Sequence, residues 1–536
     1  MVKAISARTV KTMLSDGEEI ALLDVRETGQ YADGHPFFAV PLAYSRLEID
    51  LERLVPRRSA RIVLMDDGDG VAERAARRAE GLGYSDVAIM EGGAPAWKAA
   101  GYTLFDGVNL PSKTFGELVE IERHTPRVTA EDLVAMKKRG DNMVIVDGRT
   151  WAEYQRFNIP GGISCPNGEL ALRIDAIAPD PNTRIVVNCA GRTRSIIGAQ
   201  TLIDLGVPNE VLALENGTQG WFLAGHENER GASRKYPEPS LSGEKLAERR
   251  ARAAEHAARC GVRAVTAADV RAWLADPRRT TYLLDVRTPE EVAAAPLPGF
   301  VHAPGGQLQQ ATDQWIGVKG ARIVLADGEG VRAPMVAAWL RQLGHEACVL
   351  EDRDNAPSIA ASLPEDRRPR GPELLKARAR ELHAVTPQGL SALLWSGGSV
   401  ALDLRGSQDY RDGHIPGSVW ATRPRIAKAV ADIAQPVVLI ADSPEIAAAA
   451  SIDLAELGVR EISVLAGGAK AWKADGQALN ATPDNPPDGT RIDFVFHTHQ
   501  RHDGNVEAAR AYLAWEVDLV GRLDEQERGV FRIPGH

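Results

Sequence analysis

The sequence predicts an α/β fold: four tandem copies of one domain, each a mainly parallel sheet with helices on both faces. Four apolar runs end in the pattern Asp-x-Arg, and their aspartates are Asp24, Asp147, Asp285 and Asp403. A second apolar run ends 42 residues later in the first three copies and 39 residues later in the fourth. The residues that end this second run are Asp66, Cys189, Asp327 and Asp442. We call these four copies repeats one to four.

The elements inside each repeat follow a fixed order. The first apolar run predicts a buried strand, and a polar stretch such as ETGQYADGHP predicts a helix after it. The second apolar run predicts another strand, followed by an Ala-rich amphipathic helix that ends in Leu-Gly. A short strand and a Gly-containing turn then lead to Trp97, Trp221 or Trp472, an ending that repeat three lacks. Short buried strands alternating with helices indicate a parallel sheet covered on both faces.

Each repeat spans about 100 residues, which is enough to bury a core of its own. Linkers rich in charge or proline separate the repeats, and a proline-rich break, ATPDNPPDGT, precedes the end of the chain. The predicted domains are 1–107, 126–226, 262–356 and 384–480, followed by a strand-helix tail, 481–536.

Composition excludes several classes of function. The net charge of −10 over 536 residues is unlike that of a general nucleic-acid binder. The sequence contains no run of about 18 apolar residues and no signal-peptide core at its start, so we expect no membrane partner. Its four cysteines are scattered and do not suggest a disulfide framework, which favours a cytoplasmic protein. They are Cys165, Cys189, Cys260 and Cys348.

Four motifs in this order resemble the rhodanese (thiosulfate sulfurtransferase) family over about three quarters of the chain. They are Asp-x-Arg, a GHIPG-like segment, a strand-Cys-loop-helix element, and a Gly-Gly-x-x-x-Trp ending. The GHIPG-like segment is DGHIPGS at 412–418 and FNIPGG at 157–162. The resemblance implies that a loop curls around the sulfur of a catalytic cysteine, Cys189. The loop residues that would bind substrate are Ala190, Gly191, Arg192, Thr193, Arg194 and Ser195.

This loop suits sulfur transfer because a thiolate is the form of cysteine that attacks sulfur. A helix N-terminus, a ring of backbone N–H groups and two arginines would each lower the pKa of Cys189 and bind an anionic donor. The expected reaction transfers the outer sulfur of thiosulfate, or of a related persulfide donor, to Cys189. The Cys189 persulfide then passes the sulfur to cyanide or a thiol, with ping-pong kinetics. No metal and no cofactor are expected, and a homo-oligomer or a protein acceptor is left open.

Repeats one, three and four carry Asp66, Asp327 and Asp442 where repeat two has its cysteine. A carboxylate cannot hold a sulfane sulfur, so we expect these repeats to be inactive. They are either structural modules or surfaces that dock a partner. Asp147, Arg149 and Trp221 recur in repeats without the cysteine, which favours structural roles over direct support of the reaction.

Some weaker signals and alternatives also stay open. Cys165 has the position of a buried apolar residue, although a relay role for the Cys189 sulfur is an alternative. His497, His499 and His502 have spacings that could bring a metal ligand set together, but the segment DFVFH alternates like an edge strand, with Asp503 as a helix cap.

Two other functions compete with sulfur transfer. Some protein phosphatases share the fold but use Cys-x5-Arg, whereas Arg194 here gives Cys-x4-Arg, a loop one residue short for phosphate. The other alternative is a non-enzymatic redox-sensing or scaffold protein built of the same modules, in which Cys189 is only a regulatory thiol.

Overall fold

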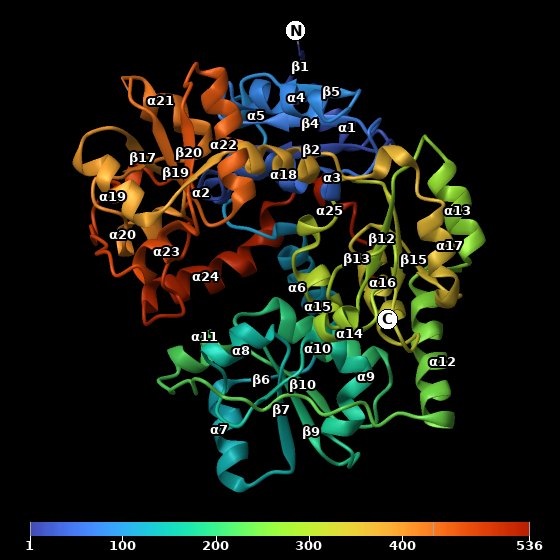
Figure 1. Ribbon diagram of the computed structural model, residues 1–536. Coiled ribbons are helices and arrows are strands. Elements are labelled where there is room, and N and C mark those ends of the chain that lie inside the picture. The colour runs from blue at the N-terminus through green and yellow to red at the C-terminus, as the bar shows by residue number, and fades with distance from the viewer. Residues whose placement is uncertain (1, 433, 535–536) are drawn as a thin grey trace. The chain divides into compact units, whose positions relative to one another are not determined.

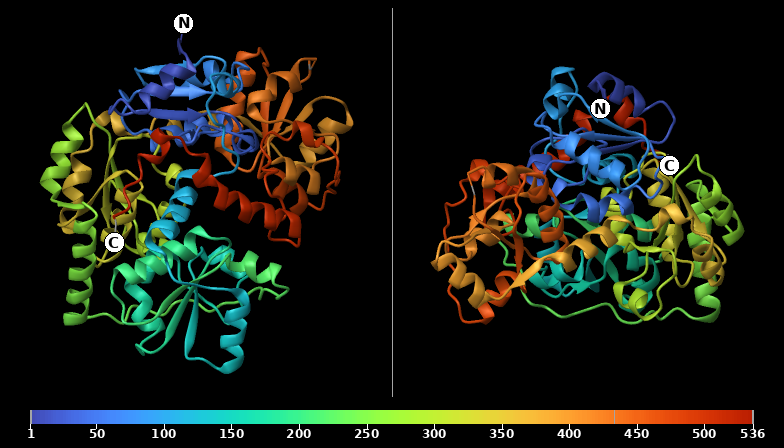
Figure 2. Two further views of the ribbon diagram at one scale, coloured as in Figure 1. Left: turned by 180° about the vertical axis from the view of Figure 1, so that it is seen from behind. Right: turned by 45° about the horizontal axis from the view of Figure 1, so that its top comes forward.

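The computed structural model describes residues 2–432 and 434–534. It contains four five-stranded sheets with the same strand order, and every strand pair within them is parallel (Figure 1). Helices flank both faces of each sheet (Figures 1 and 2). The predicted α/β architecture of four repeats is therefore confirmed. The chain forms two compact units: one holds repeats one and four, and the other holds repeats two and three and the chain from Thr498 onward.

In the first unit, repeats one and four have matching elements. The strands of repeat one are β1 (Lys3–Ile5), β2 (Ala21–Asp24), β3 (Val40–Pro41), β4 (Ile62–Met65) and β5 (Val87–Met90). Its helices are α1 (Ala7–Met13), α2 (Thr28–Asp33), α3 (Leu47–Leu54), α4 (Val71–Gly81) and α5 (Gly93–Ala99). The strands of repeat four are β16 (His383–Val385), β17 (Val400–Asp403), β18 (Val419–Trp420), β19 (Val437–Ile440) and β20 (Ile462–Leu465). Its helices, after the linker helix α18 (Gly371–Glu381), are α19 (Pro387–Trp395), α20 (Ser407–Asp412), α21 (Ile426–Val430), α22 (Pro444–Glu456) and α23 (Gly468–Ala474).

The second unit repeats this plan and adds two linker helices, α6 (Leu110–Arg123) and α12 (Gly243–Arg259). The strands of repeat two are β6 (Arg127–Val128), β7 (Met143–Asp147), β8 (Ile163–Ser164), β9 (Arg184–Asn188) and β10 (Val211–Leu214). Its helices are α7 (Ala130–Arg139), α8 (Trp151–Arg156), α9 (Asn167–Ile177), α10 (Thr193–Asp204) and α11 (Gly217–Leu223). The strands of repeat three are β11 (Arg263–Val265), β12 (Thr281–Asp285), β13 (Val301–His302), β14 (Arg322–Ala326) and β15 (Glu346–Leu350). Its helices are α13 (Ala267–Ala275), α14 (Pro289–Ala294), α15 (Gly305–Gln310), α16 (Arg332–Gln342) and α17 (Ala356–Ala361).

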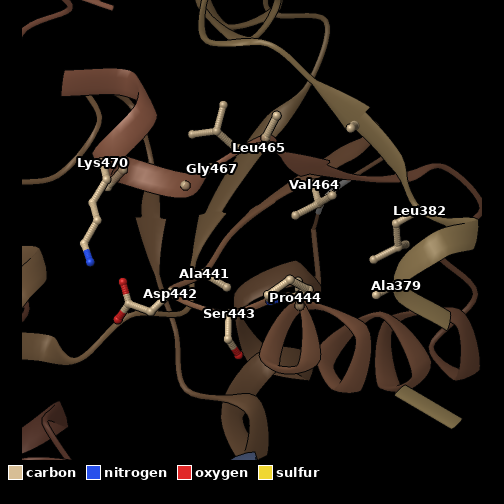
Figure 3. Close-up of a pocket in the computed structure, with 15 residues that line it drawn as sticks. Ala379, Leu382, Ala441, Asp442, Ser443, Pro444, Val464, Leu465, Gly467 and Lys470 are labelled. Carbon is tan, nitrogen blue, oxygen red and sulfur yellow. The ribbon is translucent and has the colours of Figure 1, made fainter. Parts of the chain in front are cut away.

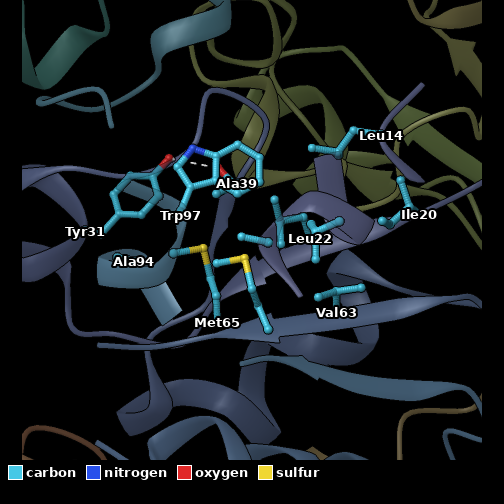
Figure 4. Close-up of a cluster of buried hydrophobic side chains, with 12 residues drawn as sticks. Leu14, Ile20, Leu22, Tyr31, Ala39, Val63, Met65, Ala94 and Trp97 are labelled. Carbon is cyan, nitrogen blue, oxygen red and sulfur yellow. Dashed lines mark hydrogen bonds between the residues drawn. The ribbon is translucent and has the colours of Figure 1, made fainter. Parts of the chain in front are cut away.

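Each sheet buries apolar side chains on both faces, as parallel sheets do. In repeat one, Trp97 and Tyr31 pack against Leu22, Val63 and Met65 of the two central strands (Figure 4). Repeat two has one core on each side of its sheet, around Val187 on one face and Val186 on the other. The central strands end together at one edge of the sheet, with Asp147 beside Asn188. Loops after these strands therefore meet at that edge, where open parallel sheets place their ligand sites.

The Asp-x-Arg pair fastens the loop that follows its strand. In repeat two, Arg149 donates to the Asp147 carboxylate at 2.7 Å and also to the carbonyl of Phe157. The other repeats form the same pair, and in each the arginine also donates to the carbonyl eight residues further on. Asp147 and Arg149 are both 1% exposed, so the pair is fully desolvated. A contact that recurs in the Asp-bearing repeats belongs to the scaffold.

The Gly-x-x-x-Trp ending holds the strand that leads to the cysteine. Gly217 has φ +53°, and a Cβ there would lie 2.2 Å from the carbonyl oxygen of Cys189. Gly93 approaches the carbonyl of Asp66 in the same way, at 2.1 Å. Trp221 is buried and donates its indole N–H to the carbonyl of Glu227 at 2.9 Å. Only glycine allows this close approach, and the tryptophan fixes the chain that follows it.

The tail differs from the expectation in two respects. Its helix, α24 (Val506–Asp518), forms as expected, although Asn505 rather than Asp503 caps it. Residues 493–497, expected as an edge strand, form turns, a bend and irregular backbone instead. The alternating aromatic residues pack around a cation: the Arg491 guanidinium lies 3.8 Å from the Phe494 ring centre and 5.5 Å from that of Phe496. The strand prediction was wrong because packing around Arg491 produces the same alternation as a sheet.

Candidate active site

Cys189 directly follows β9 at the carboxyl edge of the sheet of repeat two, and it is 2% exposed. Its Sγ lies 3.5 Å from the hydroxyl of Ser195, which in turn donates to the carbonyl of Arg192 at 2.8 Å. Helix α10 begins at Thr193, so the N-terminus of the helix follows the cysteine after three residues. Of the predicted loop, 189–195, the structure thus places Ser195 in contact with the sulfur.

Arg194 is held by a carboxylate of the same repeat. Its two terminal nitrogens donate to the two oxygens of Glu153 at 2.8 and 2.7 Å. Burial acts to raise the pKa of Glu153, but Arg194 and the Thr150 hydroxyl outweigh it and lower that pKa to about 2. Repeat three has the same pair at equivalent positions, Arg332 with Glu291 at 2.6 and 2.8 Å.

Arg192 is held by the linker helix α6, which the sequence did not connect with the site. Its Nε donates to Glu117 at 2.8 Å, and its terminal nitrogens donate to Asn216 and Glu120. Three glutamates therefore balance the two arginine charges beside the cysteine. The signal for them was present, because cations at a helix N-terminus need an anion, and α6 carries Glu117 and Glu120 one turn apart.

The helix of the tail covers the same loop. A Cβ on Gly191 would lie 2.7 Å from Oε2 of Glu516 and 3.0 Å from the Tyr512 ring. Oε1 of Glu516 accepts from the Tyr512 hydroxyl at 2.8 Å and from Lys113 at 3.0 Å. Burial, with a further contribution from Glu516, raises the pKa of Tyr512 to about 12, so it stays a hydrogen-bond donor. The structure therefore adds Lys113, Tyr512 and Glu516 to the surroundings of the loop.

Repeats one and three fill the same loop with their own carboxylate. Asp327 is 6% exposed, and its two oxygens accept backbone N–H bonds from Gly330, Val331, Arg332 and Ala333 at 2.7–3.2 Å. Asp66 is 3% exposed and accepts from Gly68 and Ala72 at 2.8 and 2.9 Å. The curled loop is thus a ring of N–H donors around an anion.

Repeat four differs from both. Asp442 is exposed, and Ser443 caps α22 by accepting from the backbone N–H of Ile446 at 3.3 Å. A cavity of about 310 Å³ opens beside them, lined by Asp442, Lys470 and mostly small or apolar residues, with no cysteine (Figure 3). No residue that lines this cavity could carry a persulfide.

The other three cysteines have surroundings that do not activate a thiol. Cys165 is fully buried in the core of repeat two, and burial, with a smaller effect of Glu169, raises its pKa well above the usual value. Burial likewise raises the pKa of Cys348 and of Cys260. A buried thiol with a raised pKa is a poor nucleophile, which argues against a relay through Cys165.

The histidines of the tail have other partners. His497 faces Asp106 at 3.3 Å, and His502 packs on the Phe157 ring with 5.3 Å between ring centres. Within the described residues, no three His, Cys, Asp or Glu side chains are grouped so that they could hold a metal ion. Across residues 2–432 and 434–534, no helix has both the length and the apolar character that a bilayer crossing requires.

Comparisons with known proteins agree with this architecture. The family model described as a rhodanese-like domain matches residues 6–100, 129–224, 266–352 and 386–475. The crystal structure of a thiosulfate sulfurtransferase from Pseudomonas aeruginosa is 41% identical, with a TM-score of 0.87 and 99% of each chain covered. An HTH-type transcriptional regulator, Rv0324 from Mycobacterium tuberculosis, is 32% identical over 105 residues, which are 20% of this chain and 45% of the regulator. The chain thus spans less than half of that regulator.

The fold and the site define a protein of four parallel α/β repeats. In one repeat a cysteine, Cys189, directly follows a central strand, where the other three have aspartate. The matches to all four repeats show that the chain belongs to the rhodanese-like family, as the motifs predicted. The match over nearly the full length of both chains makes it a sulfurtransferase enzyme.

Proposed function

We propose that the protein moves sulfane sulfur from thiosulfate, or a related persulfide donor, to cyanide or a thiol through a persulfide on Cys189. The observation that supports this most directly is the pair of loops in repeats two and three. The loop of repeat three binds its own carboxylate through four N–H groups. The equivalent loop of repeat two carries a thiol instead, and its N–H groups would stabilise the thiolate and persulfide anions.

The reaction divides into two displacements. In the first, the Cys189 thiolate attacks the outer sulfur of thiosulfate, a new S–S bond forms, and sulfite leaves with the electron pair of the broken bond. In the second, the acceptor attacks the outer sulfur of the persulfide, and the electron pair of the broken S–S bond returns to Cys189. Cyanide gives thiocyanate, and a thiolate gives a new persulfide. Neither step consumes an oxidant or a reductant.

Loop residues Ala190 to Ser195 would bind the donor and the persulfide, with the domain 126–226 as the catalytic unit. The Ser195 hydroxyl already contacts the sulfur at 3.5 Å. Three glutamates offset the positive charge of Arg192 and Arg194, so backbone N–H groups carry much of the anion binding. The four cysteines are all free, which supports a reducing, cytoplasmic setting.

Mass spectrometry of the intact protein after thiosulfate treatment tests the intermediate. We expect a gain of one sulfur atom that is located on Cys189 by peptide analysis, is absent from Cys189→Ser, and is removed by cyanide. A Cys165→Ser variant is the matched control and should gain the sulfur normally. Failure of the unmodified protein to gain sulfur from thiosulfate or from a thiol persulfide would contradict the proposed function and favour the redox-sensing or scaffold alternative.

A phosphatase is the other enzyme to exclude. The loop has Cys-x4-Arg rather than Cys-x5-Arg, and Arg194 is occupied by Glu153, so a phosphate group finds neither the space nor a free arginine. Hydrolysis of an aryl phosphate at a rate comparable with thiosulfate turnover would contradict the proposed function.

A further inference from the structure

A cavity of about 550 Å³ lies beside the cysteine loop, between repeat two and the tail. We call it the tail pocket. Repeat two contributes Phe157, Gln219, Asn228 and Arg230, and the tail contributes Arg501 and His502. All of these residues belong to the same compact unit as Cys189. A space of this size holds a small molecule rather than a water cluster alone.

The wall of the tail pocket is joined to the loop around the sulfur. The backbone N–H and the side-chain amide of Gln219 both donate to the carbonyl of Ala190 at 3.1 Å. The neighbouring Thr218 donates its backbone N–H to the carbonyl of Cys189 at 2.8 Å. Both residues line the pocket. Two residues that line the pocket therefore bind the carbonyl groups of Cys189 and Ala190, at the start of the cysteine loop.

Three buried polar atoms from its lining residues have no hydrogen-bond partner in the described part of the chain. They are Oε1 of Gln219, Oδ1 of Asn228 and Nε of Arg501. Gln219 is 2% exposed, and its orientation is fixed because its amide nitrogen already binds Ala190. Buried polar groups are nearly always satisfied, so unpaired ones that line a cavity indicate a ligand or ordered water.

The polar atoms that line the pocket indicate which chemical groups a ligand must carry. Two amide oxygens accept hydrogen bonds, which suits an ammonium or amide N–H group. The guanidinium groups of Arg501 and Arg230, at the same cavity, suit a carboxylate. Arg501 is held in place over the Tyr512 ring, 4.3 Å from its centre, and by Thr498. A small zwitterion satisfies both sets, whereas thiosulfate or cyanide satisfies only one.

We propose that the tail pocket binds the sulfur acceptor, and that the acceptor is a zwitterionic thiol of the amino-acid or small-peptide type. This inference rests on the proposed persulfide chemistry of Cys189. The acceptor thiol loses its proton to solvent, and its thiolate attacks the outer sulfur of the persulfide. One S–S bond forms and the bond to Cys189 breaks, leaving a Cys189 thiolate and a persulfide of the acceptor.

Steady-state kinetics with cysteine, glutathione and 2-mercaptoethanol as acceptors test the proposal, with thiosulfate as the donor. The third thiol is neutral and cannot use the charged groups. In Arg501→Ala, we expect the KM for cysteine and glutathione to rise about tenfold relative to that for 2-mercaptoethanol, as for the loss of one charge-assisted hydrogen bond. Arg234→Ala, which removes a surface arginine outside the pocket, should leave this ratio unchanged.

Because Arg501 also contacts Tyr512, Asn228→Ala provides an independent variant on the side of repeat two. It should change the same ratio by several-fold, while thermal unfolding remains that of the unmodified protein. Equal effects of the variants on all three thiols, or an unmodified enzyme that does not distinguish the zwitterionic thiols from 2-mercaptoethanol, would overturn the pocket assignment. Loss of persulfide formation in the unmodified enzyme would instead overturn the proposed function, so the two failures can be told apart.

Discussion

Repeats two and three share a fold, a strand order and an arginine–glutamate pair, yet they differ in what their curled loop holds. In repeat three the Asp327 carboxylate accepts four backbone N–H bonds, and in repeat two the same position is a cysteine. The difference shows that the loop itself is an anion-binding structure. An aspartate at its centre uses that capacity within the fold, whereas a cysteine leaves it for the sulfur substrate that we propose.

The comparison also separates shared from distinctive features. Arg194 with Glu153 has its counterpart in Arg332 with Glu291, so this pair cannot by itself confer activity. Arg192 has no counterpart, because Gly330 stands at its position in repeat three. The features particular to repeat two are therefore Cys189, Arg192 and the covering residues of α6 and α24.

The largest effect should come from giving the loop of repeat two the aspartate that the loop of repeat three carries. We expect Cys189→Asp to lower thiosulfate:cyanide turnover by on the order of a thousandfold or more, because no persulfide can form. Its free energy of unfolding should nevertheless equal or exceed that of Cys189→Ala, since the loop N–H groups can bind the new carboxylate. Turnover and denaturant unfolding, measured on both variants, check the two halves; an Asp variant less stable than the Ala variant would refute the view of the loop as an anion site.

Removing the carboxylate from the loop of repeat three should affect stability without affecting turnover. Asp327→Ala leaves several buried N–H groups unpaired, and we expect it to destabilise repeat three by about 2–3 kcal/mol. Asp327→Asn keeps some of these hydrogen bonds and should cost less. Denaturant unfolding provides the measurement, and Asp354→Ala, at an exposed position of the same repeat, is the matched control. An Asp327→Ala protein that unfolds like the control would show that the carboxylate is not needed.

A smaller effect should follow from removing a negative charge beside Arg192, the arginine without a counterpart in repeat three. In Glu117→Gln, Arg192 keeps a hydrogen-bond partner but loses a buried negative charge beside it. We expect the KM for thiosulfate to fall about threefold to tenfold, because the loop becomes more positive. Glu291→Gln, which changes the pair in repeat three that corresponds to Glu153 with Arg194, should leave that KM unchanged. An unchanged KM in Glu117→Gln would indicate that backbone N–H groups alone bind the donor.

The smallest effect should be a shared response to acid. The pKa values of Glu153 and Glu291 are both lowered to about 2 by their arginines, against an ordinary value of 4.5. A carboxylate with a lowered pKa in the folded state stabilises the protein above about pH 4.5, and that contribution is lost as the pH falls towards 2. Unfolding temperatures measured from pH 6 to pH 3 should therefore fall less steeply in the Glu153→Gln, Glu291→Gln double variant. Equal slopes would contradict these pKa shifts.

The sequence predicted what is encoded locally. The spacing of Asp-x-Arg, the second apolar run and the Leu-Gly helix end revealed four parallel sheets. Cys189 with the residues up to Ser195 stood out because the strand, loop and helix are contiguous. Even the contrast between Cys189 and Asp327 was visible, although the way the carboxylate is bound was not.

What the sequence did not predict depends on packing between distant segments. Glu117 and Glu120 pair with Arg192 across about 70 residues, and Glu516 approaches Gly191 across more than 300. The periodicity of a single sequence does not predict contacts between such distant residues. The expected strand at 493–497 failed for a related reason, since stacking on Arg491 imitates the alternation of a strand.

The position of Glu516 and Tyr512 over Gly191 has a consequence for synthesis. Repeat two leaves the ribosome hundreds of residues before the helix that covers its loop, so a nascent chain carries its cysteine loop uncovered. The loop can be covered only after α24 (Val506–Asp518) has been synthesised. The separation in sequence between Gly191 and Glu516 therefore delays the mature form of the site until α24 has been made.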